Sequence, residues 1–329
     1  MKIGRDFTNL LNASFLTDEE RDFLLKGKLL VSDMDAKIQI QAKADVINQI
    51  RVAKKIGLEH IELDGGIPNP FLDMTERDFE NIKNFANENN ITLSFHIPYT
   101  FVATATASFQ EKDRRLAVML IKKYIEVAEN LGCININMHP GAVPFYQTEG
   151  KYYEMIMRNV TASLLELVPY AEEKGILFHL ENNTAFDGII YEIDDCLAII
   201  KALKSEGHNI KFCFDIGHWF TRKDIGLEIP EPPENIVDTI PEEFLSGAQV
   251  HLNDYIPVIK KFHPPLHYQS GLLKRENLLR LLKKFKEKKV AIVILETAVR
   301  EINELLNAEK IMSDEQSYLK SIFQEIENQ

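Results

Sequence analysis

Short apolar runs alternate along this chain with longer segments that have the hydrophobic spacing of amphipathic helices. Eight runs are rich in Ile, Val, Leu and Phe and are bounded by Gly, Pro or Asn, which is typical of buried parallel strands. These predicted strands occupy residues 28–34, 59–64, 91–96, 133–139, 176–181, 210–215, 248–253 and 290–296. The predicted helices between them occupy residues 37–55, 75–88, 111–131, 152–174, 193–206 and 272–288.

Eight strands with helices between them are the element count of a (β/α)₈ barrel, or TIM barrel. An open doubly wound sheet also alternates, but no GxGxxG motif follows the first predicted strand. We therefore predict an α/β fold, a TIM barrel that forms one domain over residues 1–329. Residues 1–26 are expected to be an N-terminal extension with a short helix capped at Thr17. The proline-rich segment 219–247 is expected to be a long loop between strands six and seven, with the potential to act as a lid.

The composition of the chain narrows its function classes. With 45% hydrophobic residues in 329, the chain has too much apolar material for disorder to be its main state. It contains no charge-free apolar stretch of about 18 residues, so we expect no membrane span. The first residues lack the pattern of a signal peptide, and the three cysteines form no CxxC, so we expect a reduced, cytoplasmic protein. The net charge of −12 favours a small-molecule partner, although an enzyme that contacts DNA in one groove stays open.

Each of the last six predicted strands carries an imidazole or a carboxylate at or near its end. These residues are His96, His139, Glu181, Asp215 with His218 after it, His251 and Glu296. In a barrel the C-terminal strand ends meet at one face, so these side chains should converge on one cavity. Carboxylates aimed at one point repel each other, and a divalent cation relieves that cost. Mixed His, Asp and Glu ligands suit Zn²⁺, Mn²⁺, Co²⁺ or Fe²⁺ better than Ca²⁺, and seven candidates allow one to three ions per chain.

The motifs around these residues, taken together, resemble the xylose isomerase-like TIM barrel superfamily. They are HIPY (96–99), HPG (139–141), LENN (180–183), FDIGH (214–218), HLND (251–254) and ILET (294–297). This superfamily includes endonuclease IV, sugar isomerases and epimerases, and inosose dehydratases, and the resemblance extends from residue 28 to about residue 300. The metal ligands that it implies for isomerases and epimerases are Glu181, Asp215, His251 and Glu296.

The resemblance also implies further metal sites. His96 and His139, with Glu181 as a bridge, resemble an additional ion site of endonuclease IV-type members. His218 and His267 resemble part of a third site. There the family has an Asp where this chain has Pro265, and His263 is an alternative partner for His218.

Other residues are candidates for substrate binding. Glu62, in IELDGG at 61–66, is expected to point inward from the second strand, and Tyr99 resembles a residue that endonuclease IV places near its substrate. Trp219 follows His218 and is a candidate wall of the pocket, with core packing as the alternative. The remaining candidates are Asn183 of LENN, and Lys260 and Arg300, which follow strands seven and eight, where many barrels bind phosphate.

Two reactions fit this set of residues. The first is metal-dependent isomerisation or epimerisation of a sugar or sugar phosphate, with one Mn²⁺, Co²⁺, Zn²⁺ or Mg²⁺ on the substrate oxygens. Glu181 and Glu296 would exchange protons at the carbon next to the carbonyl. A lyase or dehydratase would use the same parts, and an iron oxidase is an outside alternative. We favour the isomerase or epimerase, with a small-molecule sugar as partner and homo-oligomerisation left open.

The second reaction is cleavage at abasic sites in DNA by a zinc phosphodiesterase of the endonuclease IV type. His96, His139 and His218 favour it, because a single-metal isomerase does not require them. The loop at 65–73 opposes it, because that loop contains no Arg or Lys to bind phosphate. A non-catalytic, metal-sensing barrel is a third class.

Overall fold

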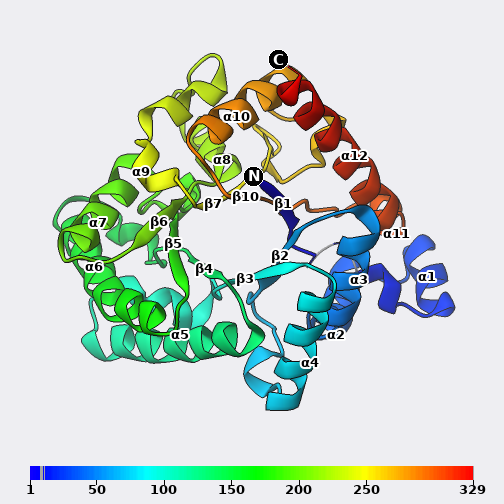
Figure 1. Cartoon of the computed structure of the whole chain (residues 1–329), viewed down its shortest axis with the longest axis horizontal. Helices are drawn as coiled ribbons and strands as arrows, with labels where there is room; N and C mark the ends of the chain where they lie inside the picture. Colours follow the sequence, from blue (N-terminus) through cyan, green and yellow to red (C-terminus); the bar gives the residue numbers. More distant parts are fainter. Residues whose placement is uncertain (8–9, 11, 329) are drawn as a thin grey trace.

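Eight parallel strands form the centre of the molecule in the computed structural model, which describes residues 1–7, 10 and 12–328 (Figure 1). The strands are β1 (Lys2–Arg5), β2 (His60–Asp64), β3 (Thr92–His96), β4 (Asn135–Met138), β5 (Leu177–Glu181), β6 (Ile210–Cys213), β7 (Gln249–His251) and β10 (Ile292–Leu295). Their order is β6-β5-β4-β3-β2-β1-β10-β7. A parallel bridge between Asp215 and His251 joins the two ends of this sheet. The predicted TIM barrel is therefore confirmed.

The prediction of the first strand is wrong. Residues 28–34 are not a strand, because helix α2 begins at Val31 and continues to Ala44. The buried residues Met34 and Ile38 continue the apolar spacing at intervals of four, which is a helical period. The first strand is instead β1, which has only four residues and pairs with β2 and β10. The segment predicted as an N-terminal extension therefore contains a barrel strand.

The rest of the segment 1–26 contains the short helix that the sequence predicts. Turn η1 (Asn12–Phe15) precedes α1 (Asp18–Leu25), and Thr17 caps α1 in a capping box with Glu20, as expected. Residues 8, 9 and 11 of this segment lie outside the described residues.

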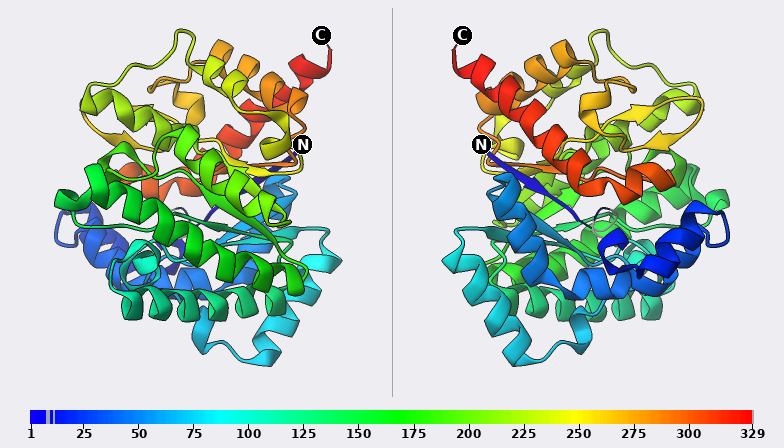
Figure 2. Two further views of the ribbon diagram at one scale, coloured as in Figure 1. Left: turned by 90° about the vertical axis from the view of Figure 1, so that its left-hand side faces the viewer. Right: turned by 90° about the vertical axis from the view of Figure 1, so that its right-hand side faces the viewer.

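Helices surround the barrel on its outside (Figures 1 and 2). After α2 they are α3 (Val46–Ile56), α4 (Glu76–Glu88), α5 (Glu111–Leu131), α6 (Gly150–Glu173), α7 (Ile193–Ser205), α10 (Arg275–Glu287), α11 (Ile302–Leu306) and α12 (Ala308–Glu327). The helix predicted at 37–55 is in fact two, because the Asp45 side chain caps α3 by accepting from the Asn48 amide. Helix α12 contacts both α10 and α3, so it closes the ring between the last and the first helices.

The segment 219–247 consists of short helical turns. They include the end of α8 (Ile216–Phe220), η6 (Thr221–Ile225), η7 (Pro233–Thr239) and α9 (Glu242–Leu245). Turn η7 packs against α10, where Asn277 donates a 3.0 Å hydrogen bond to the buried carboxylate of Glu234. The expected irregular character is therefore present, and part of the segment is attached to the outer helix layer.

Further short elements connect the strand ends at the mouth of the barrel. They are η2 (Phe71–Asp73), η3 (Phe101–Ala107), η4 (Phe145–Gln147), η5 (Ala185–Asp187), the hairpin of β8 (Tyr255–Ile256) and β9 (Lys261–Phe262), and η8 (Leu266–Tyr268). None of the helices in the described part of the chain is long and apolar enough to span a membrane.

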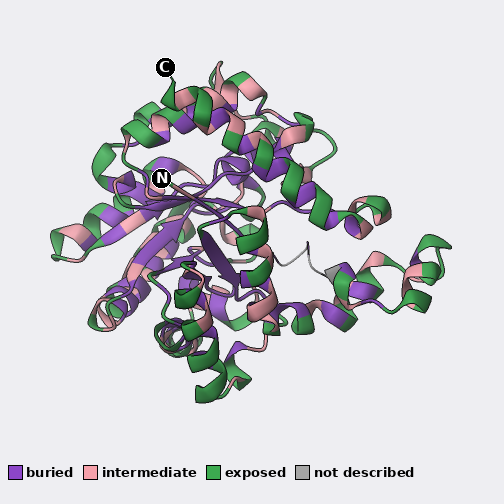
Figure 3. Cartoon of the chain, turned by 45° about the vertical axis from the view of Figure 1, so that its right-hand side comes forward, coloured by how far each residue is buried: buried purple, intermediate pink, exposed green. Residues whose placement is uncertain are grey.

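Side chains alternate between the two faces of each strand, and this alternation determines which residues enter the barrel. On β2, Ile61 and Leu63 belong to the apolar core, whereas Glu62 contacts His251 across the barrel. Most residues of the barrel strands are buried (Figure 3). The barrel interior therefore holds a layer of buried polar groups beneath its C-terminal mouth.

Candidate metal centre and active site

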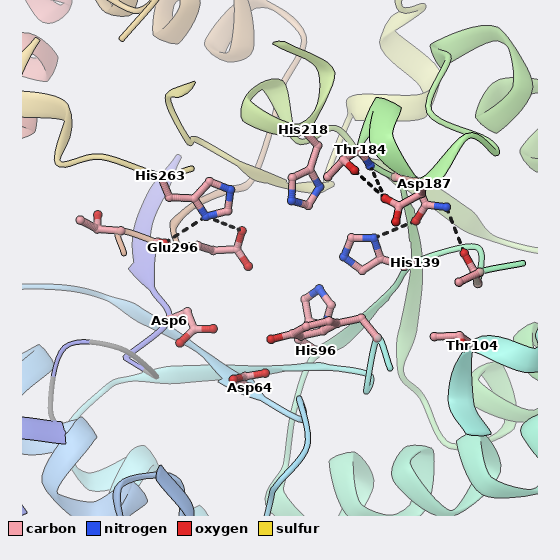
Figure 4. Close-up of a pocket in the computed structure, with 15 residues that line it drawn as sticks. Asp6, Asp64, His96, Thr104, His139, Thr184, Asp187, His218, His263 and Glu296 are labelled. Atoms are coloured by element: carbon pink, nitrogen blue, oxygen red, sulfur yellow. Dashed lines mark hydrogen bonds and ion pairs between the residues drawn. The ribbon is translucent and has the colours of Figure 1, made fainter. Parts of the chain in front are cut away.

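A cavity of about 330 Å³ lies at the C-terminal ends of the strands (Figure 4). Its lining includes four carboxylate residues, Asp6, Asp64, Asp187 and Glu296, and four histidines, His96, His139, His218 and His263. Among the described residues, no Lys or Arg lines it. The cavity is therefore small and polar, and among the lining residues that the structure describes only the histidines can carry a positive charge.

The carboxylate of Glu181 lies at the centre of the histidines. Its Oε2 atom is 3.2 Å from Nε2 of His96 and 3.6 Å from Nε2 of His139. Its Oε1 atom is 3.2 Å from Nδ1 of His218 and 3.2 Å from Nδ1 of His251. Glu181 itself is completely buried. Each of its two oxygens therefore faces a different pair of imidazoles, which is the arrangement of a bridging ligand.

The four residues of the expected metal quartet come together around His251. One ligand atom from each of Glu181, Asp215, His251 and Glu296 lies within 4.8 Å of the others. Nδ1 of His251 is 3.1 Å from Oε2 of Glu296 and 3.7 Å from Oδ2 of Asp215. Both Nδ1 of His251 and Oε1 of Glu181 are buried without a hydrogen-bond partner. Because a cation at this point would satisfy both atoms, these residues fit a divalent metal ion.

Two further groups of ligand atoms adjoin the quartet. His96, His139 and Glu181 form one group, and Asp215, His218 and His263 form the other. The rings of His218 and His263 have centroids 5.5 Å apart. The quartet shares Glu181 with the first of these groups and Asp215 with the second, so each of these two carboxylates lies between two groups of ligand atoms.

The structure does not bring His267 together with His218, contrary to the pairing inferred from the sequence. His267 lies on η8, where its ring packs against Tyr268 with centroids 4.6 Å apart, and it belongs to none of the described ligand groups. The alternative, His263, occupies the place beside His218. The reason is the β8–β9 hairpin, after which the His263 amide donates to the Asp254 carbonyl and the backbone adopts a positive φ of 50°.

Charge in the centre is balanced by the histidines. Burial alone would lower the pKa of His96, but its contact with Glu181 raises it to about 10. The pKa of His218 likewise rises to about 10, because Asp215 and Glu181 outweigh the effect of burial. For Glu181 burial is outweighed by His139 and His251, so its pKa falls well below the usual range. A cation that enters must therefore displace protons from imidazoles, and metal affinity should fall at low pH.

A second set of buried residues holds the ligands in place. Oε2 of Glu62 is 2.8 Å from Nε2 of His251, and Gln249 donates to the other oxygen of Glu62. Nδ2 of Asn253 donates to Oδ2 of Asp215 and to Oε2 of Glu296, each at 2.7 Å. Such contacts fix the tautomer and orientation of metal ligands. Glu62, predicted to bind substrate, lies instead in the barrel interior, where it contacts a histidine of the quartet.

The other predicted substrate residues divide into two groups. Tyr99 and Asn183 line the cavity, and Asn183 also contacts Nδ1 of His139 at 3.2 Å. Trp219, Lys260 and Arg300 are not among the residues that line it. Trp219 is buried with its ring 4.9 Å from the Arg222 guanidinium, Lys260 lies over the ring of Phe186, and Arg300 is exposed. The segment 219–247 also contributes no lining residue, so its role as a lid stays a prediction.

Sequence reasoning missed several lining residues. Asp64 lies two residues after Glu62, and side chains two apart on a strand point to the same face. This spacing could therefore have indicated Asp64. Asp6 was hidden because β1 was not predicted. The other missed residues are Thr104, Gly141, Ala142, Thr184, Asp187 and Thr297, which come from the loops and turns after the strands.

Comparison with known proteins identifies the family. The family model described as xylose isomerase-like TIM barrel matches residues 50–322. The chain belongs to this family. The resemblance inferred from the sequence motifs is thereby confirmed, and the xylose isomerase-like TIM barrel is the fold that the strands and helices form.

The curated relatives match over part of their length. The uncharacterized protein MJ1311 of Methanocaldococcus jannaschii is 29% identical over 146 residues, which are 44% of this chain and 48% of that protein. MJ1614 of the same organism is 28% identical over 149 residues, 43% of this chain and 55% of that protein. The match thus spans about half the length of each curated relative.

Several solved structures are similar over nearly the whole chain. D-psicose 3-epimerase of Clostridium cellulolyticum H10, solved with D-tagatose, has a TM-score of 0.67 and 15% identity, with 99% of each chain covered. The 3-keto-D-glucoside 4-epimerase YcjR of E. coli has a TM-score of 0.62 and 16% identity, with 98% of this chain and 99% of that chain covered. The IolI protein with a bound zinc atom has a TM-score of 0.66 and 14% identity, with 98% of each covered. At these identities the likeness shows the fold.

Proposed function

We propose that this protein is a divalent-metal-dependent isomerase or epimerase that transfers protons next to the carbonyl group of a sugar. The observation that carries the proposal is the ligand group of Glu181, Asp215, His251 and Glu296, with two buried unpartnered atoms, at a small polar cavity. The names of the similar structures, which include two sugar epimerases, support the same class of reaction.

A divalent ion held by the quartet would polarise the carbonyl and the neighbouring hydroxyl of the substrate. Glu296 is the carboxylate of the quartet that lines the cavity, so it is placed to take the proton from the adjacent carbon. Glu181 is buried, but its Oε2 contacts His96 and His139, which both line the cavity. Those two histidines can pass a proton between the buried Glu181 and the substrate.

The lining of the cavity favours a free sugar over a sugar phosphate. No Lys or Arg is among its described lining residues, which include four carboxylate residues, and of these Asp64 is paired with the buried Lys43. Hydroxyl groups are good partners for carboxylates, Thr and Tyr, whereas a phosphate would have to rely on histidines and bound ions. The proposed partner is therefore a small neutral sugar.

The experiment is a proton-exchange assay that does not require the product to be known. Chelated protein is reloaded separately with Mn²⁺, Co²⁺, Zn²⁺ or Mg²⁺ and incubated with a panel of ketoses and aldoses in D₂O. NMR should show deuterium entering the carbon next to the carbonyl only in metal-loaded samples. Exchange that persists after chelation, or a protein that takes up none of these metals, would contradict the proposal.

A second candidate is a zinc phosphodiesterase of the endonuclease IV type. The observation that favours it is the presence of two extra ligand groups, one with His96 and His139 and one with His218 and His263. A single-metal isomerase needs neither. Two or more zinc ions per chain, together with chelator-sensitive nicking of a duplex with an abasic site, would favour this candidate over the first. Product analysis in the same assays would reveal a lyase, dehydratase or oxidase that uses these residues.

A further inference from the structure

Cys213 lies two residues before Asp215, in the barrel interior and close to the quartet. It ends β6, and its register partner on β5 is Glu181, so both side chains point to the same face of the sheet, into the barrel. One ligand atom from each of Glu181, Cys213 and His251 lies within 4.8 Å of the others. All three residues are completely buried. The other cysteines, Cys133 and Cys196, belong to none of the ligand groups found among the described residues.

Two neighbours of Cys213 each have a buried atom that lacks a hydrogen-bond partner. Oε1 of Glu181 and Nδ1 of His251 have no hydrogen-bond partner although both atoms are buried. These two residues therefore offer an oxygen and a nitrogen to an ion, and Cys213 adds a sulfur. A set of sulfur, nitrogen and oxygen ligands suits Zn²⁺, Co²⁺ or Cd²⁺, whereas Mg²⁺ and Mn²⁺ prefer oxygen-rich sites.

We propose that Cys213 is a metal ligand that binds a soft or borderline divalent cation together with Glu181 and His251. On binding, the S–H bond breaks, a sulfur–metal bond forms and the proton passes to solvent, with no change of oxidation state. This position shares Glu181 and His251 with the quartet. An ion bound at Cys213 therefore excludes an ion bound at the quartet. Soft cations should bind with Cys213, and hard cations should bind with Asp215 and Glu296. The inference rests on the proposed metal dependence of the quartet.

The experiment uses cobalt as a spectroscopic probe of the full-length, chelated protein. Cobalt bound by a thiolate gives an intense near-ultraviolet charge-transfer band, whereas cobalt bound by oxygen and nitrogen alone gives only weak visible bands. Wild type, Cys213→Ser and the matched buried control Cys196→Ser are titrated with Co²⁺. Proton release is followed in parallel in weakly buffered solution, and wild type should release about one proton more per cobalt than Cys213→Ser.

The expected result is a charge-transfer band in wild type and in Cys196→Ser, and its loss in Cys213→Ser, which still binds cobalt. If Cys213→Ser does not fold, retention of the band in both Cys196→Ser and Cys133→Ser assigns the thiolate by elimination. Cobalt bound by wild type without the band would overturn the role of Cys213 and leave the proposed function intact. No cobalt binding at all would overturn both.

Discussion

Oε1 of Glu181 lies 3.2 Å from Nδ1 of His251, and both atoms are buried without any hydrogen-bond partner. Leaving a buried polar atom unsatisfied costs about 1–3 kcal/mol. The carboxylate and a protonated imidazole attract each other at this distance, and a shared cation would take the place of that proton and satisfy both atoms. This pair is therefore the point from which the metal chemistry of the barrel can be tested.

Glu62 should determine how well His251 binds metal. Glu62→Gln replaces the carboxylate that faces Nε2 of His251 at 2.8 Å, so the ring loses the partner that fixes its orientation. We expect metal affinity to fall by roughly 10–100-fold, measured by competition with a chelating dye. The control is Glu234→Gln, which alters a buried carboxylate bonded to Asn277 and Arg280 on the outer layer. Equal affinity in Glu62→Gln and wild type would show that Glu62 has no such role.

His263 and His267 form a natural pair for testing the third ligand group. His263→Ala removes a ligand beside His218, whereas His267→Ala alters a ring that packs on Tyr268. If the third group is occupied, His263→Ala should lose one zinc per chain by elemental mass spectrometry, and His267→Ala should keep the full number. Loss of zinc in His267→Ala alone would contradict the assignment of His263 to this ligand group.

Glu296→Gln should slow proton exchange strongly with little effect on folding. Glu296 lines the cavity and is partly exposed, so the loss of its charge leaves few buried groups unpaired. A positioned general base contributes roughly 10²–10⁴-fold to the rate, and kcat for deuterium exchange at saturating metal should fall by about that factor. Glu301→Gln, at an exposed carboxylate five residues further on, is the control and should retain activity. Near-normal turnover in Glu296→Gln would exclude the proposed base.

His60 should make the chelated protein less stable in acid. Burial, with Lys2 nearby, lowers the pKa of His60 from 6.5 to about 3, and its ring nitrogens bond to the hydroxyls of Thr92 and Ser94. Below about pH 6.5 the unfolded chain binds a proton that the folded chain does not, so the free energy of unfolding falls as pH decreases. The slope is about 1.4 kcal/mol per pH unit and continues down to about pH 3.

Urea unfolding at several pH values between about 7 and 5 measures this slope for wild type and for His60→Gln. The substitution should flatten the dependence little near pH 7 and by about 1.4 kcal/mol per pH unit near pH 5, because the unfolded variant no longer takes up that proton. Identical slopes in the two proteins would show that His60 is not held neutral by the fold.

Local patterns predicted most of the fold and of the quartet. The barrel strands from β2 to β7, and β10, are short and largely buried apolar runs, and most of the helices between them have an apolar stripe. Both can therefore be predicted from residue spacing. Strand β1 could not be found in this way, because Lys2–Arg5 has little apolar character and is held by pairing with β2 and β10. Because β1 was not predicted, Asp6, which follows it and lines the cavity, was not predicted either.

The sequence by itself determined that His96, His139, Glu181, Asp215, His251 and Glu296 would meet. Each lies within two residues of the end of a strand, and parallel strands place their ends at one face. Only the tertiary structure decided what lies around them. His263 lies beside His218, in place of His267, because a hairpin turns the chain back toward His218. Glu62 contacts His251 because β2 and β7 face each other across the barrel. Strand ends follow from local periodicity, whereas loop residues and contacts across the barrel depend on packing between segments far apart in the chain.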